Sequence, residues 1–147
     1  YAGLIQGYSY VHEAISDLRI RTKAKQLMLD AGATLPAEVR NQVPDYTKAL
    51  LARFDNPELA HRLDQIAMDG SQKLPYRFLD TLREGGSPML IQAVRAWMTF
   101  CQEQTEKGIP LYDPKAKEIA QAVNSERSET ALLEVIGATD LAPTILG

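Results

Sequence analysis

The sequence is poor in the residue types that enzymes use for covalent or metal chemistry. Its 147 residues include one cysteine, Cys101, and two histidines, His12 and His61. A single cysteine excludes an internal disulfide and a cysteine cluster for zinc, which fits a reducing, cytoplasmic compartment. Two histidines are too few for a zinc site without carboxylate help, and their spacing does not suggest one. The residues themselves therefore predict no metal centre.

Long apolar runs and an excess of basic residues are also missing. No apolar run approaches the roughly 20 residues of a membrane span, and no signal-peptide pattern is present. The net charge of −3 argues against broad nucleic-acid binding, which needs a basic surface. The glycines never form the phosphate-binding pattern GxGxxG after a strand, and neither HExxH nor a nucleophile elbow occurs. We expect neither nucleic acid nor a membrane as a partner.

What the sequence does contain is helical periodicity. Apolar residues recur at helical spacing in the first sixteen residues, and Leu90, Val94, Trp97 and Cys101 mark the inner face of a later helix. No segment shows the alternation of a β-strand. We therefore predict an all-α fold of about seven or eight packed helices, with no domain boundary within residues 1–147.

Glycines and capping residues divide the first part of the chain. Gly3 and Gly7 are four apart on the first predicted helix, so another element could approach it closely. Ser16 is a candidate cap for the second helix, and Gly32 is a candidate stop. The run RIRTKAK in this second helix is typical of a solvated helix face.

The stretch QIAMDGSQKLPYR places a lysine between two predicted helices. Asn56 and Pro57 predict the start of the first helix, and Gly70 its end. Pro75 predicts the start of the next helix, so Lys73 is expected in a short irregular link. Two interpretations are open: Lys73 caps the free carbonyls of the preceding helix, or it reaches into a cleft and binds a ligand.

Three runs together resemble one known family. YAGLIQGYSYVHEAISD, RFDNPELAHRLDQIAMDGSQKLPYR and, more loosely, LYDPKAKEI are similar to the C-terminal domain of the long-chain mannitol dehydrogenases. That family includes mannitol 2-dehydrogenase, other polyol dehydrogenases, D-mannonate oxidoreductase (fructuronate reductase) and tagaturonate reductase. The ordered combination of GYxxVHE, RFxNP and DGSxKxP is fairly specific. The resemblance covers Tyr1 to about Ile119 and is weak beyond Ser125.

The resemblance implies that this chain is the helical, substrate-side half of a two-domain dehydrogenase. The other half would be an N-terminal Rossmann domain that binds NAD or NADP and is absent from this chain. The family's catalytic motif, K-x4-N-x2-H, would lie just upstream of Tyr1. Lys23 and Lys25 are not substitutes, because neither is followed by the required Asn and His. We therefore expect no catalytic residue in this chain and no activity from it alone.

The resemblance also implies substrate-binding residues. The family's DGSxK lysine binds a hydroxyl or carboxylate of the open-chain sugar, and that position is Lys73. The mannitol enzymes carry a substrate-facing arginine eight residues earlier, where this chain has Gln65. This departure favours the hexuronate branch and the pair D-mannonate/D-fructuronate, with mannitol or another polyol as the alternative. Lys73 would supply the cation for a carboxylate, and Arg77 is a weaker candidate.

Other interpretations of the same residues stay open. Asp69 and Ser71 are expected to shape the turn, and Arg53 and Asn56 to hold a helix junction. An alternative function of a different class is that of a noncatalytic helical interaction module with an acidic surface. The absence of a catalytic constellation favours that module, whereas the matches to GYxxVHE and DGSxKxP oppose it.

Overall fold

The computed structural model describes residues 1–85 and 87–147. Within them every regular element is helical, apart from an isolated bridge between Tyr10 and Arg62, and the predicted all-α class is confirmed. More segments form than the seven or eight expected, because several are only one or two turns long. No helix in the described part is long and apolar enough to cross a membrane.

Contacts divide the chain into two compact units. The first comprises Tyr1–Ala67 with Ser87–Leu90, and the second Met68–Gly86 with Ile91–Gly147. The sequence shows no composition change at these points. The run PYRFLDTLREGG, expected to form the helix that Pro75 starts, ends at Gly86, which lies outside the described residues.

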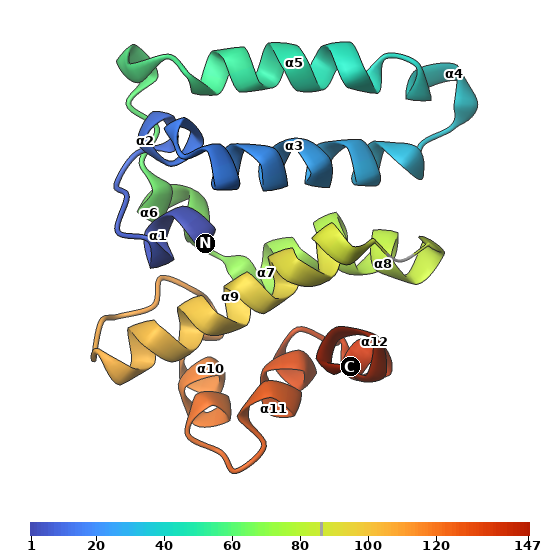
Figure 1. Cartoon of the computed structure of the whole chain (residues 1–147). Coiled ribbons are helices and arrows are strands. Elements are labelled where there is room, and N and C mark those ends of the chain that lie inside the picture. The colour runs from blue at the N-terminus through green and yellow to red at the C-terminus, as the bar shows by residue number, and fades with distance from the viewer. Residues whose placement is uncertain (86) are drawn as a thin grey trace. The chain divides into compact units, whose positions relative to one another are not determined.

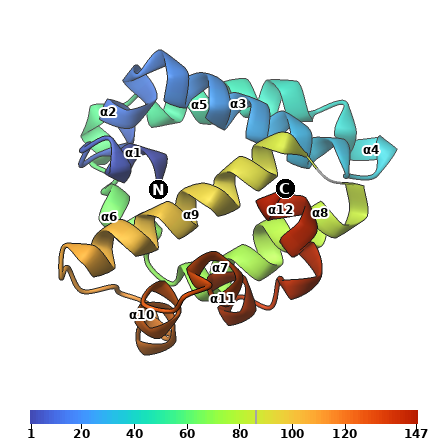
Figure 2. The ribbon, with the colours of Figure 1, turned by 60° about the horizontal axis from the view of Figure 1, so that its bottom comes forward.

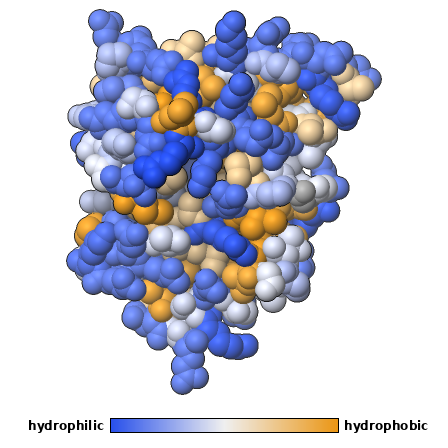
Figure 3. Space-filling view, viewed as in Figure 1, coloured by the Kyte–Doolittle hydropathy of each residue, from blue (hydrophilic) through white to orange (hydrophobic). Residues whose placement is uncertain are grey.

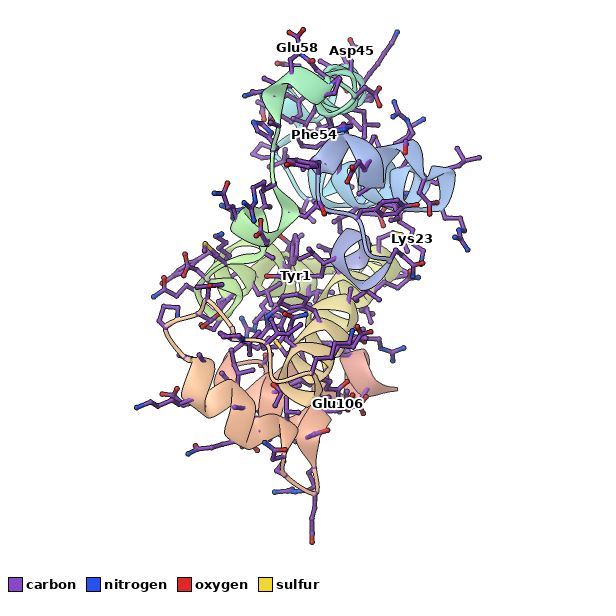
Figure 4. All side chains as sticks on the ribbon, turned by 90° about the vertical axis from the view of Figure 1, so that its left-hand side faces the viewer. Tyr1, Lys23, Asp45, Phe54, Glu58 and Glu106 are labelled. Atoms are coloured by element: carbon purple, nitrogen blue, oxygen red, sulfur yellow. The ribbon has the colours of Figure 1, made fainter. Side chains whose placement is uncertain are left out.

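The first unit is built around two long helices that lie side by side, α3 and α5 (Figure 1). Val11, Ile15 and Leu51 are its buried apolar cluster, and Phe54 packs against them from the end of α5 (Figure 4). The elements of this unit are α1 (Ala2–Ile5), α2 (Val11–Ser16), α3 (Leu18–Ala33), α4 (Ala37–Arg40), α5 (Val43–Phe54), η1 (Pro57–Leu59) and α6 (Leu63–Ala67).

The first predicted helix is interrupted, which corrects the prediction of one continuous helix. The chain turns at Gly7, whose φ of +85° is left-handed. The carboxylate of Glu13 then accepts hydrogen bonds from the backbone N–H groups of Ser9 and Tyr10, each at 2.9 Å. These bonds satisfy donors at the start of α2, so a second helix begins there.

Two glycines in this unit allow close packing. A Cβ on Gly3 would lie 2.8 Å from Leu63 Cδ1 and 2.9 Å from Ala14 Cβ, which confirms the predicted close approach. Gly32 is buried inside the last turn of α3, and a Cβ there would overlap Val43. Its main role is therefore packing against α5 rather than ending the helix.

The cap of α3 also differs from the prediction. Asp17, not Ser16, accepts a hydrogen bond from the backbone N–H of Arg19, at 2.8 Å. Lys23 and Lys25 on α3 are exposed, as expected for a solvated face. The face of the molecule in Figure 3 is mostly hydrophilic, with hydrophobic residues in small separate groups.

The second unit holds most of the fully buried side chains of the described residues. Its helices α10 and α11 pack against each other (Figure 2). The elements are α7 (Gly70–Leu74), η2 (Pro75–Leu79), α8 (Asp80–Gly85), α9 (Pro88–Glu106), α10 (Ala116–Val123), α11 (Ser128–Val135), η3 (Thr139–Leu141) and α12 (Ala142–Leu146). The first residues of α9, up to Leu90, belong to the first unit.

The predicted inner face of α9 is confirmed. Leu90, Val94, Trp97 and Cys101 each expose at most 1% of their surface. Burial, together with the negative charge of Asp113, raises the pKa of the Cys101 thiol to about 12. Cys101 is therefore a small apolar core residue that stays protonated.

Candidate functional site

The chain before the candidate lysine is less regular than predicted. Asn56 and Pro57 do start a helical segment, and Asn56 Oδ1 accepts from the backbone N–H of Glu58 at 3.0 Å. That segment, η1, ends at Ala60, whose φ of 45° is left-handed. A separate short helix, α6, follows. The single helix predicted from Pro57 to Asp69 is therefore wrong, because a left-handed residue breaks its hydrogen-bond ladder.

The predicted irregular link around Lys73 is also wrong. Lys73 lies in α7, and η2 and α8 continue the helical path without a gap. Pro75 stands inside this path rather than at the start of a new helix. Proline has no N–H to donate, and the segment adopts π-type geometry, with the N–H of Asp80 bound to the carbonyl of Pro75. The helix thus accommodates Pro75 by a local change from α-type to π-type hydrogen bonding.

The turn before α7 is made by a non-glycine residue in a left-handed conformation. Asp69 has φ 59° and ψ 34°. Its N–H donates to the carbonyl of Tyr112 at 3.0 Å, and its own carbonyl accepts from the N–H groups of Gln72 and Lys73, at 3.1 and 2.9 Å. A left-handed conformation costs energy in a residue with a side chain, so these three bonds hold a strained turn in place.

A carboxylate from a distant part of the sequence binds the next residue. Ser71 is 3% exposed. Its N–H donates to Asp113 Oδ2 at 2.8 Å, and its hydroxyl donates to Asp113 Oδ1. The DGSxKxP run and the LYDPKAKEI run therefore meet in the second unit. Ser71 has a structural role, and so does Asp69, which agrees with the expectation that both shape the turn.

Lys73 is half-buried in the last turn of α7. Its ammonium donates a hydrogen bond to the carbonyl of Met68 at 2.5 Å. This contact is the carbonyl-capping role that was one of the two interpretations of Lys73.

Gln65, the second predicted site residue, lies exposed on α6. Its backbone N–H donates to Asp64 Oδ1 at 2.9 Å. The Arg62 guanidinium binds the same carboxylate and holds the pKa of Asp64 below its usual value. Gln65 belongs to the first unit, whereas Lys73 belongs to the second. Arg77 is exposed in η2.

The two histidines lie in the first unit. The ring of His12 stacks on Tyr10 with centroids 5.6 Å apart, and the carbonyl of His61 accepts from the N–H of Val11 at 2.9 Å. Across residues 1–85 and 87–147, no group of three or more His, Cys, Asp or Glu side chains could hold a metal ion.

One important residue at this site escaped sequence reasoning. In the sequence, Asp113 followed by Pro114 indicates only the start of a helix. Its carboxylate does accept from the N–H of Lys115, at 2.9 Å, but it also binds Ser71, which is 42 residues away. No spacing rule links Asp113 to Ser71, so their contact becomes visible only in the structure.

Comparison with known proteins places this arrangement in a family. The model of the mannitol dehydrogenase C-terminal domain matches residues 1–142. The chain belongs to this family. The match extends past Ser125, where the sequence alone suggested only a weak likeness.

Members of the mannitol dehydrogenase family are among the similar proteins. The chain is 36% identical over 141 residues to the uncharacterized oxidoreductase YdfI of Escherichia coli (strain K12), covering 91% of this chain and 29% of that protein. It is 38% identical over 134 residues to D-mannonate oxidoreductase of the same strain, covering 86% and 27%. It is 32% identical over 146 residues to mannitol 2-dehydrogenase of Phaeosphaeria nodorum, covering 93% and 26%. The chain thus spans less than a third of these relatives.

The mannitol dehydrogenase motifs have visible structural roles in this chain. Gly7 and Glu13 of GYxxVHE turn the chain and cap α2. Asn56 of RFxNP caps η1. Ser71 of DGSxKxP binds Asp113. These four motif residues therefore build the scaffold, whereas Lys73 of DGSxKxP carries a flexible ammonium.

Proposed function

We propose that this chain is the substrate-side domain of an NAD(P)-dependent oxidoreductase that interconverts a sugar acid and its keto form, with D-mannonate and D-fructuronate as the pair. The observation that carries the proposal is the family match over residues 1–142, together with relatives that are named oxidoreductases. The relative named D-mannonate oxidoreductase is 38% identical.

The residues described here do not fit a dinucleotide cofactor. Such cofactors bind at the end of a parallel sheet, where a glycine-rich turn leads into a helix, and the regular elements of the described residues are all helices. We therefore assign NAD or NADP to an N-terminal Rossmann domain of the full-length protein. That domain would hold the nicotinamide, which would supply the hydride chemistry, and the lysine of the K-x4-N-x2-H motif would move the proton.

In this proposal the chain contributes binding and orientation. Lys73 binds the carboxylate or a hydroxyl of the open-chain sugar, and its flexible stem and compact ammonium suit such a ligand. Gln65 binds a second hydroxyl, since its amide both donates and accepts. Holding the substrate in a fixed position lowers the barrier by orienting the reacting C–H bond.

The alternative substrate is mannitol or another polyol. The relative from Phaeosphaeria nodorum is named mannitol 2-dehydrogenase and is 32% identical. The absence of an arginine at residue 65 favours the sugar acid in our interpretation. A neutral amide there leaves Lys73 as the cation for a carboxylate, with Arg77 as the weaker candidate.

The test is hydride transfer by the full-length protein, followed as NAD(P)H absorbance. The panel consists of D-mannonate with D-fructuronate, D-altronate with D-tagaturonate, and D-mannitol with D-fructose, and the 147 residues alone serve as the control. We expect the highest kcat/KM on D-mannonate and no turnover by the control. A preference for mannitol would overturn the assigned substrate. No activity on any pair would overturn the oxidoreductase proposal and favour an interaction module.

A further inference from the structure

We propose that Asp113 is a positioning residue for Lys73: through Ser71 it holds the turn from which the lysine reaches the substrate. The inference rests on the proposed function, because it takes Lys73 as a substrate ligand. Every contact that supports it lies within the second unit.

Both oxygens of the Asp113 carboxylate accept hydrogen bonds from the protein. Oδ2 accepts from the N–H of Ser71 at 2.8 Å, and Oδ1 accepts from the Ser71 hydroxyl and from the N–H of Lys115 at 2.9 Å. Charge-assisted bonds of this kind are stronger than neutral ones. Asp113 therefore acts on the turn and not on the substrate directly.

The neighbour of Asp113 holds the other side of the same turn. The carbonyl of Tyr112 accepts from the N–H of Asp69 at 3.0 Å. Two consecutive residues thus bind the two residues that flank Gly70, which is itself buried. Because hydrogen bonds hold the residues on both sides of Gly70, the left-handed conformation of Asp69 cannot relax without breaking at least one of these bonds.

The segment that provides these contacts is itself anchored. The ammonium of Lys115 donates to the carbonyl of Val135 at 2.7 Å, at the C-terminal end of α11. The carbonyl of Asp113 accepts from the N–H of Ala116 at 3.0 Å as α10 begins. The segment that contains Asp113 is thus bound to the start of α10 and to the end of α11, two helices that pack against each other.

Lys73 depends on this turn at both ends of its side chain. Its backbone N–H binds the carbonyl of Asp69 at 2.9 Å, and its ammonium binds the carbonyl of Met68 at 2.5 Å. Both carbonyls belong to residues just before Ser71. Releasing Ser71 would let Lys73 sample more positions, and the substrate would then have to order the side chain when it binds.

The experiment is a set of steady-state measurements on the full-length protein with D-mannonate. The variants are Asp113→Ala, Asp113→Asn and Ser71→Ala, each made alone and together with Lys73→Ala. Asp140→Ala is the matched control, since it removes an exposed carboxylate of the same unit that binds Arg83 at 2.8 and 3.0 Å. Thermal unfolding confirms that each variant is folded. If Asp113→Ala does not fold, Asp113→Asn and Ser71→Ala carry the test.

We expect the KM for D-mannonate to rise about tenfold in Asp113→Ala, which loses all three bonds to the carboxylate. The rise should be smaller in Asp113→Asn, whose amide oxygen can still accept, and smallest in Ser71→Ala, which loses only the hydroxyl bond. The KM for NAD(P) should be unchanged in these variants. In the control Asp140→Ala, the KM for D-mannonate should be unchanged as well. In the Lys73→Ala background these changes should add nothing, because the residue they position is gone.

Two results would overturn the inference in different ways. If Lys73→Ala raises KM and the Asp113 variants raise it further by the same factor, Asp113 acts independently of Lys73, and only the positioning role fails. If Lys73→Ala leaves KM unchanged, Lys73 is not a substrate ligand, and both the proposed site and this inference fail.

Discussion

Gly32 offers a sharp test of how the first unit is packed. It lies in α3 against the first residue of α5, and a Cβ at this position would stand 2.8 Å from Val43 Cγ2 and 3.1 Å from Val43 Cβ. Real Cβ atoms essentially never come within 3.0 Å of another atom, so in Gly32→Ala either the Val43 side chain or the two helices must shift.

The expected free-energy change has two opposing parts. Overfilling a packed contact costs about 1–3 kcal/mol. Replacing glycine by alanine inside a helix stabilises it by about 1 kcal/mol. Gly85, at the end of α8, is the matched control, because a Cβ there meets nothing within 4 Å. We expect Gly32→Ala to be less stable than Gly85→Ala by about 1–3 kcal/mol.

A second substitution identifies the cause. Val43→Ala removes the two methyl groups that a Cβ on residue 32 would overlap. In that background Gly32→Ala should become stabilising, with a coupling energy of about 1 kcal/mol or more. The assay is urea unfolding of the 147-residue chain. Equal stability of Gly32→Ala and Gly85→Ala, with no coupling to Val43, would refute the packing argument.

Three further predictions concern single residues. The pKa of Glu13 is lowered because the N–H groups of Tyr10 and Ser9 bind its carboxylate. The stabilisation of the fold by these bonds is therefore present above the ordinary pKa of 4.5 and is lost as the pH falls through the lower pKa of the folded state. At pH 7 the free energy of unfolding should be larger than that of Glu13→Gln, and this difference should shrink below pH 4.5. A difference that stays constant with pH would contradict the prediction. Cys101, with its pKa of about 12, should react with iodoacetamide at pH 9 about a hundredfold more slowly in the folded chain than in urea; equal rates would mean it is accessible. Gln65→Ala in the full-length protein should lower kcat/KM for D-mannonate by about fivefold, the loss of one neutral hydrogen bond, and unchanged kinetics would exclude Gln65 from the site.

The sequence was most informative where periodicity and packing agree. The inner face of α9 follows directly from its i, i+4, i+7 spacing, and the all-α class follows from the lack of alternating segments. Asn56 and Pro57 start a helical segment as expected, because a side-chain cap and a fixed φ act locally. These features depend on residues that are close in sequence.

The errors arise where a local signal meets a constraint from elsewhere in the chain. Gly70 and Pro75 read as a helix stop and a helix start, yet both lie in one helical path. The turn falls instead on Asp69, held by Tyr112 through a backbone bond that no local pattern reveals. The left-handed Ala60 is likewise invisible in the sequence, since alanine ordinarily favours helices.

The candidate site shows the same division. Residue chemistry marks Lys73 as unusual, and only the family resemblance assigns it a substrate. Asp113 became visible only when the fold brought it to Ser71, because hydrogen bonds between residues 42 positions apart leave no mark in spacing or composition.

The most direct test of the central claim is the steady-state behaviour of Lys73→Met in the full-length protein. Methionine keeps much of the side chain's length and removes the charge and the donors. The account predicts that the KM for D-mannonate rises by at least tenfold while the KM for NAD(P) stays the same, as expected when one charged hydrogen bond to the substrate is lost. Unchanged kinetics for the sugar acid would contradict the claim and would leave Lys73 as a cap on the carbonyl of Met68.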